Sequence, residues 1–285
     1  MAAVAVIVHH EREQAAELAR DAADWLEDRG HDVVMPMRDA GLVGRPDLGV
    51  AEATLGHGLD VAVSLGGDGT MLRTVALMAR EAVPIIGVNV GQLGYLSEVE
   101  PEGMRMALKR FLAGSYEVEE RMLLQVDVDA EAFEAGPSHL ALNEAVLEKT
   151  PMGHTVRLGV SVDGEAFTTY AADGLIVATP TGSTAYAFSA RGPIVEPTHR
   201  CLLMTPVSPH MLFDRSLVLD PSAAVRIEVL GHRPATLSVD GSNLGTLHNG
   251  EAVTYTAAEA TARIVAFGPR YFLRILKSKF GLSDR

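Results

Sequence analysis

The chain lacks several features that mark particular classes of protein. Only one of its 285 residues is a cysteine, Cys201, which excludes an internal disulfide framework and a cysteine-rich zinc site. Basic residues are also scarce, because 24 Lys and Arg stand against 37 Asp and Glu and give a net charge of −13. This balance argues against a nucleic-acid partner, which would need a basic surface. A small anionic ligand is still allowed, since a local site can be positive on an acidic protein.

Long apolar runs are absent as well. No stretch approaches the ~20 residues of a membrane helix, so no membrane partner is expected. The amino terminus has no basic segment before its apolar residues and runs directly into His9 and His10, which predicts a cytoplasmic protein. Hydrophobic residues make up 47% and charged residues 21%, as in a globular protein with a core. The length suggests two domains, at about 150 residues each.

The first half, residues 1–115, alternates strand-like and helix-like segments. This order predicts a Rossmann-like α/β domain built on a parallel sheet. Strands are expected at residues 4–8, 32–35, 61–65 and 85–89, and helices at residues 11–29, 70–80 and 101–113. The Gly- and Pro-rich residues 41–49 predict a mobile loop.

The second half, residues 116–268, has many short alternating segments and predicts a mostly antiparallel β domain that binds the substrate. Strands are expected at residues 124–129, 140–149, 156–162, 167–171, 175–178, 225–229, 236–239 and 262–267. Asp163 and Gly164 form a hairpin signal between two of them. Residues 270–280 predict an amphipathic terminal helix that packs back on the first domain, to which residues 269–285 are therefore assigned.

A glycine-rich turn follows the third expected strand, with Gly66, Gly67, Asp68, Gly69 and Thr70 in sequence. The glycines let the backbone approach a bulky anion, and Thr70 stands where the N-cap of the next helix is expected. The turn lies at the carboxyl end of a parallel strand, where open α/β sheets bind ligands. It matches neither the P-loop nor the dinucleotide fingerprint. The carboxylate of Asp68 suits a divalent cation or a proton acceptor, and equally a tight turn.

Three further motifs carry polar residues. Asn143 and Glu144 form a polar pair on an expected strand, where an exposed strand face is the simpler explanation. Residues 179–186 read Thr-Pro-Thr-Gly-Ser-Thr-Ala-Tyr, which is either a helix-capping loop or a ligand site. Asp173-Gly174 and Asp240-Gly241 are turn dipeptides by default.

Together, in this order and spacing, these motifs resemble the NAD kinase family over nearly the whole chain. The Gly-Gly-Asp-Gly turn is shared with lipid kinases and phosphofructokinases, whereas the motif at residues 179–186 is far more specific. The resemblance implies transfer of the γ-phosphate of ATP to the 2′-hydroxyl of the adenosine ribose of NAD, which gives NADP. It also implies a requirement for Mg²⁺ or a similar divalent cation, and a homodimer or homotetramer.

The resemblance also implies a role for each motif residue. Asp68 corresponds to the general base, and Gly66, Gly67, Gly69 and Thr70 lie near the substrate phosphates. Asn143 corresponds to a contact with the adenine and Glu144 to a contact with the ribose hydroxyls. The remaining substrate-binding positions are Asp173 at the nicotinamide end, Thr181, Thr184, Ala185, Tyr186 and Ser189 around the adenosine, and Asp240. No metal ligand is assigned.

The chain departs from the family pattern at a few positions. Arg191 stands where a glycine is usual, and is either a surface residue, a partner of Glu196, a phosphate contact or a change in the acceptor pocket. Tyr95 replaces a phenylalanine in the Gly-Gln-Leu-Gly-Tyr-Leu segment at residues 91–96. His210 is placed beside the site in the family, although a structural loop histidine is equally consistent. The alternatives are therefore a paralogous kinase of a nucleoside, nucleotide or sugar hydroxyl, and a non-catalytic nucleotide sensor.

Overall fold

The computed structural model describes residues 1–91, 94–130, 133–150, 154–268 and 272–282. Two compact units account for the chain: unit 1 comprises residues 1–120 and 262–285, and unit 2 comprises residues 121–261. The chain passes between the units inside strands β6 (Glu117–Asp129) and β17 (Ala252–Ala266), so each of these strands contributes residues to both. The parallel character of the first unit and the antiparallel character of the second agree with the sequence-based prediction.

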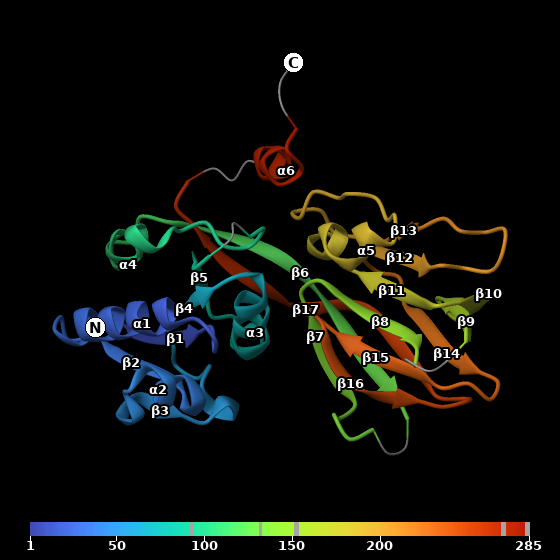
Figure 1. Ribbon diagram of the computed structural model, residues 1–285, viewed down its shortest axis with the longest axis horizontal. Helices are drawn as coiled ribbons and strands as arrows, with labels where there is room; N and C mark the ends of the chain where they lie inside the picture. The colour runs from blue at the N-terminus through green and yellow to red at the C-terminus, as the bar shows by residue number, and fades with distance from the viewer. Residues whose placement is uncertain (92–93, 131–132, 151–153, 269–271, 283–285) are drawn as a thin grey trace. The chain divides into compact units, whose positions relative to one another are not determined.

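Unit 1 contains a parallel sheet (Figure 1), in which the strand order is β5-β4-β1-β2-β3 and the end of β17 pairs with β5. The strands are β1 (Ala3–Val8), β2 (Asp32–Pro36), β3 (Gly49–Val50), β4 (Val61–Gly66) and β5 (Ile85–Asn89). The helices are α1 (Glu13–Glu27), α2 (Met37–Val43), α3 (Asp68–Met78), α4 (Met104–Leu112) and α6 (Phe272–Phe280), with short 3-10 turns at Pro46–Leu48, Glu52–Thr54, Ala79–Glu81 and Pro101–Gly103. Residues 270 and 271, where the terminal helix was expected to begin, lie outside the described residues.

The core of unit 1 follows from the periodicity of its elements. Helix α1 buries alanines and Trp25 and Leu26 at helical spacing, and β1 adds Val4, Val6 and Val8 from one face. Helix α4 covers the same cluster with Met104, Ala107, Leu108 and Phe111. Because β1 and β4 are covered on both faces, nearly all their residues are buried, as expected for central parallel strands.

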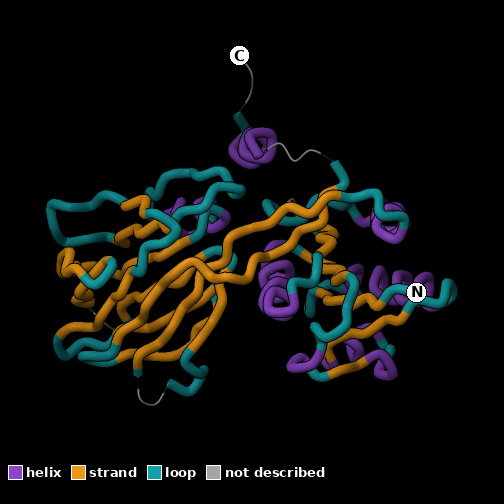
Figure 2. Tube along the Cα trace, turned by 180° about the vertical axis from the view of Figure 1, so that it is seen from behind, coloured by secondary structure: helices purple, strands orange, loops and turns teal. Residues whose placement is uncertain are grey.

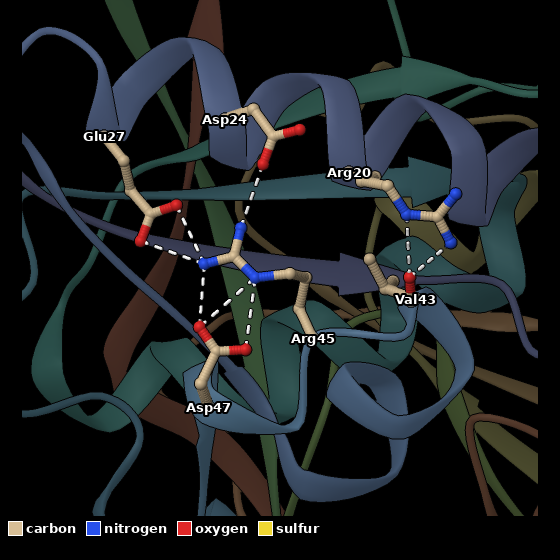
Figure 3. A network of polar contacts seen from close by, with 6 residues as sticks. All are labelled: Arg20, Asp24, Glu27, Val43, Arg45 and Asp47. Carbon is tan, nitrogen blue, oxygen red and sulfur yellow. Dashed lines mark hydrogen bonds and ion pairs between the residues drawn. The ribbon is translucent and has the colours of Figure 1, made fainter.

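The predicted loop at residues 41–49 is wrong, because this segment is helix, 3-10 turn and strand. The reason is a set of contacts that sequence periodicity does not reveal (Figure 3). Arg45 pairs with Asp24 and Glu27 of α1 and with Asp47 at N···O distances of 2.9, 2.9 and 2.7 Å. Arg20 donates to the backbone oxygen of Val43 at 3.0 Å from Nε. The last residue of α2 is thus tied to α1, and Gly44 ends the helix with φ +79°.

Unit 2 is built mainly of strands (Figure 2), arranged in two sheets whose facing residues form one core. One sheet contains β10 (Glu165–Ala172), β9 (Val156–Val162), β14 (Val225–Leu230) and β17, with β6 and β7 (Ser138–Ala141) beside them. The other has the order β13 (Leu217–Leu219), β12 (Leu202–Val207), β11 (Gly174–Ala178), β8 (Glu144–Lys149), β15 (Ala235–Val239) and β16 (Ser242–Leu247). The pairs within the second sheet are antiparallel.

Two tight hairpins in unit 2 use the same dipeptide. Asp163 and Gly164 join β9 to β10 with φ values of +52° and +82°, which confirms the predicted hairpin. Asp240 and Gly241 join β15 to β16 with φ values of +46° and +78°. Positive φ at both central residues is the signature of a type I′ turn, which favours Asp-Gly and Asn-Gly.

The single strand expected at residues 140–149 is instead two strands with a bend between them. Residues up to Ala141 form β7, Leu142 and Asn143 form the bend, and β8 begins at Glu144. The two strands pair in different sheets. The prediction that Asn143 lies on a strand is therefore wrong.

Among the helices of the described residues, none is long and apolar enough to cross a membrane.

Candidate functional site

The glycine-rich turn of unit 1 leads from β4 directly into α3. The helix begins at Asp68, and Gly67 is its N-cap with an extended backbone, φ −96° and ψ −165°. The expected N-cap role of Thr70 is wrong, because the Gly67 oxygen already accepts the amides of Thr70 and Met71 at 3.1 Å. Thr70 is buried beneath Gly66, where a Cβ would lie 2.2 Å from the Thr70 Oγ1. Gly66 therefore has to be glycine for the helix to start this close to the strand.

The Asp68 carboxylate binds the backbone of a neighbouring loop. Oδ1 accepts the amides of Tyr95 and Leu96 at 3.1 and 3.2 Å, and Oδ2 accepts Tyr95 at 3.0 Å. A carboxylate has about four lone-pair positions, so one is left for a further hydrogen bond. Burial and the nearby Asp68 charge raise the pKa of the Tyr95 phenol. Gln92 and Leu93 of this loop lie outside the described residues.

A cavity of about 660 Å³ opens beside Asp68 and Gly67, Gly69 and Thr70 of the turn. The cationic side chains in its lining are those of Arg12, Arg38, Arg73 and Lys279, and the anionic ones are those of Glu11 and Asp68. His9 and His10 also line the cavity. Four cations against two anions make the lining positive although the whole chain carries −13. This composition suits a phosphorylated ligand, with arginine able to bind phosphate through two parallel hydrogen bonds.

A buried carboxylate organises one wall of this cavity. Asp39 is fully buried, accepts the Val8 amide at 2.8 Å and lies 3.0 Å from His10 Nε2. Arg73 of α3 forms an ion pair with Asp39 and contacts His10. Because a buried carboxylate requires such partners, Asp39 holds His10 and Arg73 in place at the cavity wall. His10 lies in the turn after β1, and its side chain is half-buried in this cluster.

In unit 2, the bend between β7 and β8 is held by the Asp240 carboxylate. Oδ2 accepts the Leu142 amide at 2.7 Å, and Oδ1 accepts the amides of Asn143 and Glu144 at 2.8 and 3.1 Å. The Asp240 amide in turn donates to the Glu144 oxygen at 2.9 Å. The turn dipeptide is thus also an anchor for the polar pair.

Thr179 and Gly182 hold the carbonyl groups of the same bend. The Thr179 hydroxyl donates to the Leu142 oxygen at 2.5 Å, and its amide donates to the Asn143 oxygen at 2.9 Å. Gly182 packs against the backbone of Asn143, where a Cβ would lie 2.1 Å from the Asn143 oxygen. The amides and carbonyls of the bend are therefore engaged by two different segments of unit 2.

Glu144 has the most altered acidity of the predicted site residues. Burial first, and then the charge of Asp240, raise its pKa to about 8, and a hydrogen bond from the Tyr186 amide opposes them. Glu144 is 7% exposed, and its Oε2 has no hydrogen-bond partner among the residues that the structure describes. A buried oxygen without a partner is a position for a ligand hydroxyl.

A second cavity of about 480 Å³ contains Asp173, Tyr186, Glu148, Lys149 and Asn243 in its lining. Lys149 Nζ lies 2.8 Å from Asp173 Oδ1 in an ion pair. Tyr186 is 38% exposed, which leaves its ring available for stacking. Burial and the charges of Glu148, Asp173 and Glu144 raise the pKa of its phenol.

The remaining predicted residues lie on or after the 3-10 turn Thr181–Thr184 and the short helix α5 (Tyr186–Ser189). Thr181 is buried, and its hydroxyl is 3.5 Å from an Arg121 nitrogen. The Thr184 hydroxyl donates to the Thr181 oxygen at 3.4 Å, the Ala185 amide donates to Gly182, and Ser189 is exposed.

Arg191 and His210 also have defined places. Arg191 follows α5 with φ +66°, and its side chain is exposed. Glycine is favoured at such a left-handed position after a helix, which explains why a glycine is usual there. Among the residues described, no ion pair joins Arg191 to Glu196. His210 is exposed, and its amide donates to the Ala171 oxygen at 2.7 Å.

Two family models match the chain. The model of the ATP-NAD kinase N-terminal domain matches residues 4–116, and that of the C-terminal domain matches residues 142–267. The chain belongs to the ATP-NAD kinase family. It is 42% identical over 281 residues to the NAD kinase of Heliobacterium modesticaldum, covering 98% of each chain. The NAD kinase of Symbiobacterium thermophilum is 41% identical, with 96% of this chain and 97% of that protein covered.

Solved structures agree with this family assignment. The structure of yeast NADH kinase complexed with NADH has the same fold, with a TM-score of 0.90 and 24% identity over 100% of this chain and 89% of that one. An NAD kinase from Archaeoglobus fulgidus in complex with ATP gives a TM-score of 0.75 and 27% identity, with 98% of both chains covered. As a member of the ATP-NAD kinase family, the protein is a phosphotransferase.

Several polar residues of this family member were not found by sequence reasoning. Arg12 follows β1, and strand ends in a parallel sheet share an edge, so the order of strands could have indicated it. Arg73 lies five residues after Asp68 on the same helix, and this spacing is a weaker indication that it belongs to the site. The pairing of Asp39 with His10 and Arg73 depends on tertiary packing and leaves no local pattern.

Proposed function

We propose that the protein transfers the γ-phosphate of ATP to the 2′-hydroxyl of the adenosine ribose of NAD, giving NADP. The observation that carries this proposal is the match of both family domains, together with a full-length relative that is named NAD kinase and is 42% identical. The cationic cavity beside Asp68 supports a phosphorylated donor, because it concentrates four positive side chains on an acidic protein.

Asp68 is proposed as the general base. A ribose hydroxyl is a weak nucleophile until a base takes its proton, and such help contributes about 10²–10⁴-fold in rate. The carboxylate keeps one acceptor position after its contacts with Tyr95 and Leu96. Gly66, Gly67, Gly69 and Thr70 are proposed to lie near the substrate phosphates, with Arg12 of the same cavity lining neutralising phosphate charge.

Residues of unit 2 are proposed to bind the acceptor. The partnerless Oε2 of Glu144 suits a ribose hydroxyl, and the Asn143 amide can both donate to and accept from an adenine edge. Tyr186 supplies an exposed ring face for stacking. The proposed adenosine contacts are completed by Thr181, Thr184, Ala185 and Ser189, with Asp173 at the nicotinamide end.

A divalent cation such as Mg²⁺ is proposed to enter with ATP. Among the described residues, no group of three or more His, Cys, Asp or Glu side chains is placed to hold a metal ion. Phosphate oxygens supply the ligands that Mg²⁺ prefers, and the cation would spread the charge of the transferring group. A cytoplasmic location remains a prediction from the amino-terminal sequence, and a homodimer or homotetramer remains a prediction from the family resemblance.

A kinase of another nucleoside-type hydroxyl is the second candidate, because Arg191 replaces a usual glycine. Arg191 is exposed and stands at a helix end, where its φ of +66° strains a non-glycine residue. This position favours a surface role over a change in the acceptor pocket. The first candidate is therefore preferred.

An acceptor panel tests the proposal. The purified protein is incubated with ATP and Mg²⁺ and with NAD, NADH, adenosine, other nucleosides or a sugar, and products are identified by mass spectrometry. We expect one added phosphate on the adenosine ribose of NAD or NADH, and much slower reaction with the others. Faster turnover of a free nucleoside would favour the paralogous kinase, and the absence of turnover with every acceptor would favour a sensor.

A further inference from the structure

Both oxygens of the Asp240 carboxylate accept hydrogen bonds from the bend before β8. Oδ1 accepts two amides and Oδ2 accepts one, and these three amides belong to the consecutive residues 142–144. Hydrogen bonds from amides to a carboxylate are charge-assisted and stronger than neutral ones. The carboxylate is committed to the protein backbone.

The hairpin turn between β15 and β16 directs the Asp240 carboxylate toward the bend. Asp240 has φ +46° and Gly241 has φ +78°, so the turn backbone is held in the type I′ form between β15 and β16. Strand β15 pairs with β8 along five residue pairs, from Ala235 opposite Lys149 to Val239 opposite Ala145. The turn therefore arrives beside the first residue of β8, and the Asp240 amide donates to the Glu144 oxygen at 2.9 Å.

The bend determines where two polar side chains point. Adjacent residues of a regular strand project to opposite faces, so a straight strand could not present both Asn143 and Glu144 to one ligand. The bend interrupts the strand at Asn143 and removes this restriction. Thr179 holds the Leu142 and Asn143 oxygens of the bend, while Asp240 holds its amides.

We propose that Asp240 is a positioning residue, which presents Asn143 and Glu144 to the adenosine moiety of the acceptor and does not bind the acceptor itself. This inference rests on the proposed function, because it concerns the acceptor of that reaction. It departs from the family resemblance, which places Asp240 among the substrate-binding residues.

The variant Asp240→Asn tests the proposal with little change to the turn. Asparagine is as well suited to a type I′ turn as aspartate. Its single oxygen can keep the amides of Asn143 and Glu144, but its NH₂ group then faces the Leu142 amide, and two donors oppose each other. We expect the bend to shift and the Kd of NAD, measured by calorimetry, to rise about tenfold, which corresponds to about 1.4 kcal/mol.

Asp163→Asn is the matched control. Asp163 stands at the same position of an Asp-Gly turn with φ +52°, and its carboxylate accepts one exposed amide, that of Ala224, at 2.8 Å. The control makes the same chemical change in the same turn type within unit 2. We expect it to leave the Kd of NAD and the KM of ATP unchanged.

A double-variant cycle separates positioning from a general loss of structure. Because Asp240 acts partly through Glu144, the variant Asp240→Asn combined with Glu144→Gln should raise the Kd of NAD by less than the product of the two single effects, since coupled residues are not additive. A general loss of structure would multiply the two effects. The KM of ATP should stay constant in all these variants.

Several outcomes would overturn the proposal. They are an unchanged Kd in Asp240→Asn, an equal rise in Asp163→Asn, and fully multiplicative effects in the cycle. If Asp240→Asn does not fold, Thr179→Val weakens the same bend from its other side, and an unchanged Kd there would also overturn it. Failure of the proposed function is seen separately, since the unmodified protein would then not phosphorylate NAD, whatever the Kd values of the variants.

Discussion

At the scale of single residues, two carboxyl groups with different surroundings determine the expected chemistry. Asp68 accepts hydrogen bonds from the backbone amides of Tyr95 and Leu96. Glu144 is buried beside a second carboxyl group, and its pKa is raised to about 8. The carboxylate of Asp68 suits proton removal from a hydroxyl, whereas the buried Glu144 suits a hydrogen bond to a ligand.

Replacing Asp68 by asparagine should lower kcat by about 10²–10⁴-fold, because the base is lost. We expect the Kd of NAD to stay within a few-fold of the unmodified value, since Asp68 is proposed to act on the proton. Single-turnover kinetics and calorimetry measure the two quantities. A kcat within a factor of about three would remove Asp68 from the role of base. The circular dichroism spectrum provides the control for folding, because the variant also loses an acceptor for the Tyr95 and Leu96 amides.

Glu144 should make the free energy of unfolding depend on pH. Its folded pKa of about 8 lies above the ordinary carboxyl value of 4.5, so the folded state holds the proton more tightly and stability is lost as pH rises from about 4.5 to 8. Glu144→Gln cannot ionise and should be more stable than the unmodified protein by on the order of 2–3 kcal/mol at pH 8, with a much smaller gain at pH 5.

Urea denaturation at pH 5 and pH 8 measures this difference. Glu148→Gln is the control, because Glu148 lies on the same strand, β8, and is half-buried. We expect Glu148→Gln to show no gain that grows with pH. Equal gains at both pH values in Glu144→Gln would contradict a raised pKa of Glu144. NAD affinity should fall in Glu144→Gln, so stability and binding would change in opposite directions.

Sequence reasoning at the residue scale identified the residues that belong to motifs. It could single out Asp68 because a carboxylate among glycines is unusual, and the Asp240 turn because Asp-Gly favours a hairpin. It could not reveal that the Asp240 carboxylate meets residues 142–144, which lie about a hundred positions earlier in the chain. The cluster of Asp39, His10 and Arg73 was missed for the same reason.

At the scale of elements, glycines decide how closely the motif at residues 179–186 can approach the bend. A Cβ at Gly182 would lie 2.1 Å from the Asn143 oxygen, so Gly182→Ala should push the two segments apart. We expect a loss of about 1–3 kcal/mol in the free energy of unfolding, as for other overpacked sites, together with a raised KM for NAD. Thermal denaturation and steady-state kinetics measure both.

Gly41→Ala is the contrasting variant. Gly41 lies inside α2, it is exposed, and a Cβ there would meet no atom within 4 Å. Alanine is favoured over glycine in a helix interior by about 0.8–1 kcal/mol, so this variant should gain stability. If both variants lost stability equally, the close approach of Gly182 to Asn143 would not explain the effect.

The predicted elements also show where local patterns stop being informative. Strands with continuous apolar runs, such as β1 and β4, were located within a residue or two. Strand β12 was missed because its apolar run ends at Met204 and is followed closely by Pro206, and proline normally argues against a central strand. Strand β16 was missed because Ser242–Leu247 is rich in polar residues and glycine and has no clear alternation.

At the scale of the whole molecule, the chain leaves unit 1 and later returns to it. Residues 262–285 belong to unit 1, where Ile264 pairs with Ile85 of β5 and Val265 joins the core cluster that contains Trp25. Composition and length suggested two domains, but strand pairing of so late a segment with β5 is a long-range contact that no local pattern indicates. The returning strand is therefore part of the stability of unit 1.

A pair of truncations tests this contribution. Trp25 is the chain's one tryptophan and is buried in the core of unit 1, so its fluorescence reports on that unit alone. A chain that stops after Thr261 loses Ile264 and Val265, and burying each such side chain is worth about 1.5–3 kcal/mol. Because both side chains are lost, we expect the free energy of unfolding of unit 1 to fall by at least about 3 kcal/mol. This loss should appear as red-shifted Trp25 emission or as a lower urea midpoint. A chain that stops after Gly268 keeps both residues and should retain most of the midpoint, whereas equal midpoints in the two chains would show that the returning strand adds nothing to unit 1.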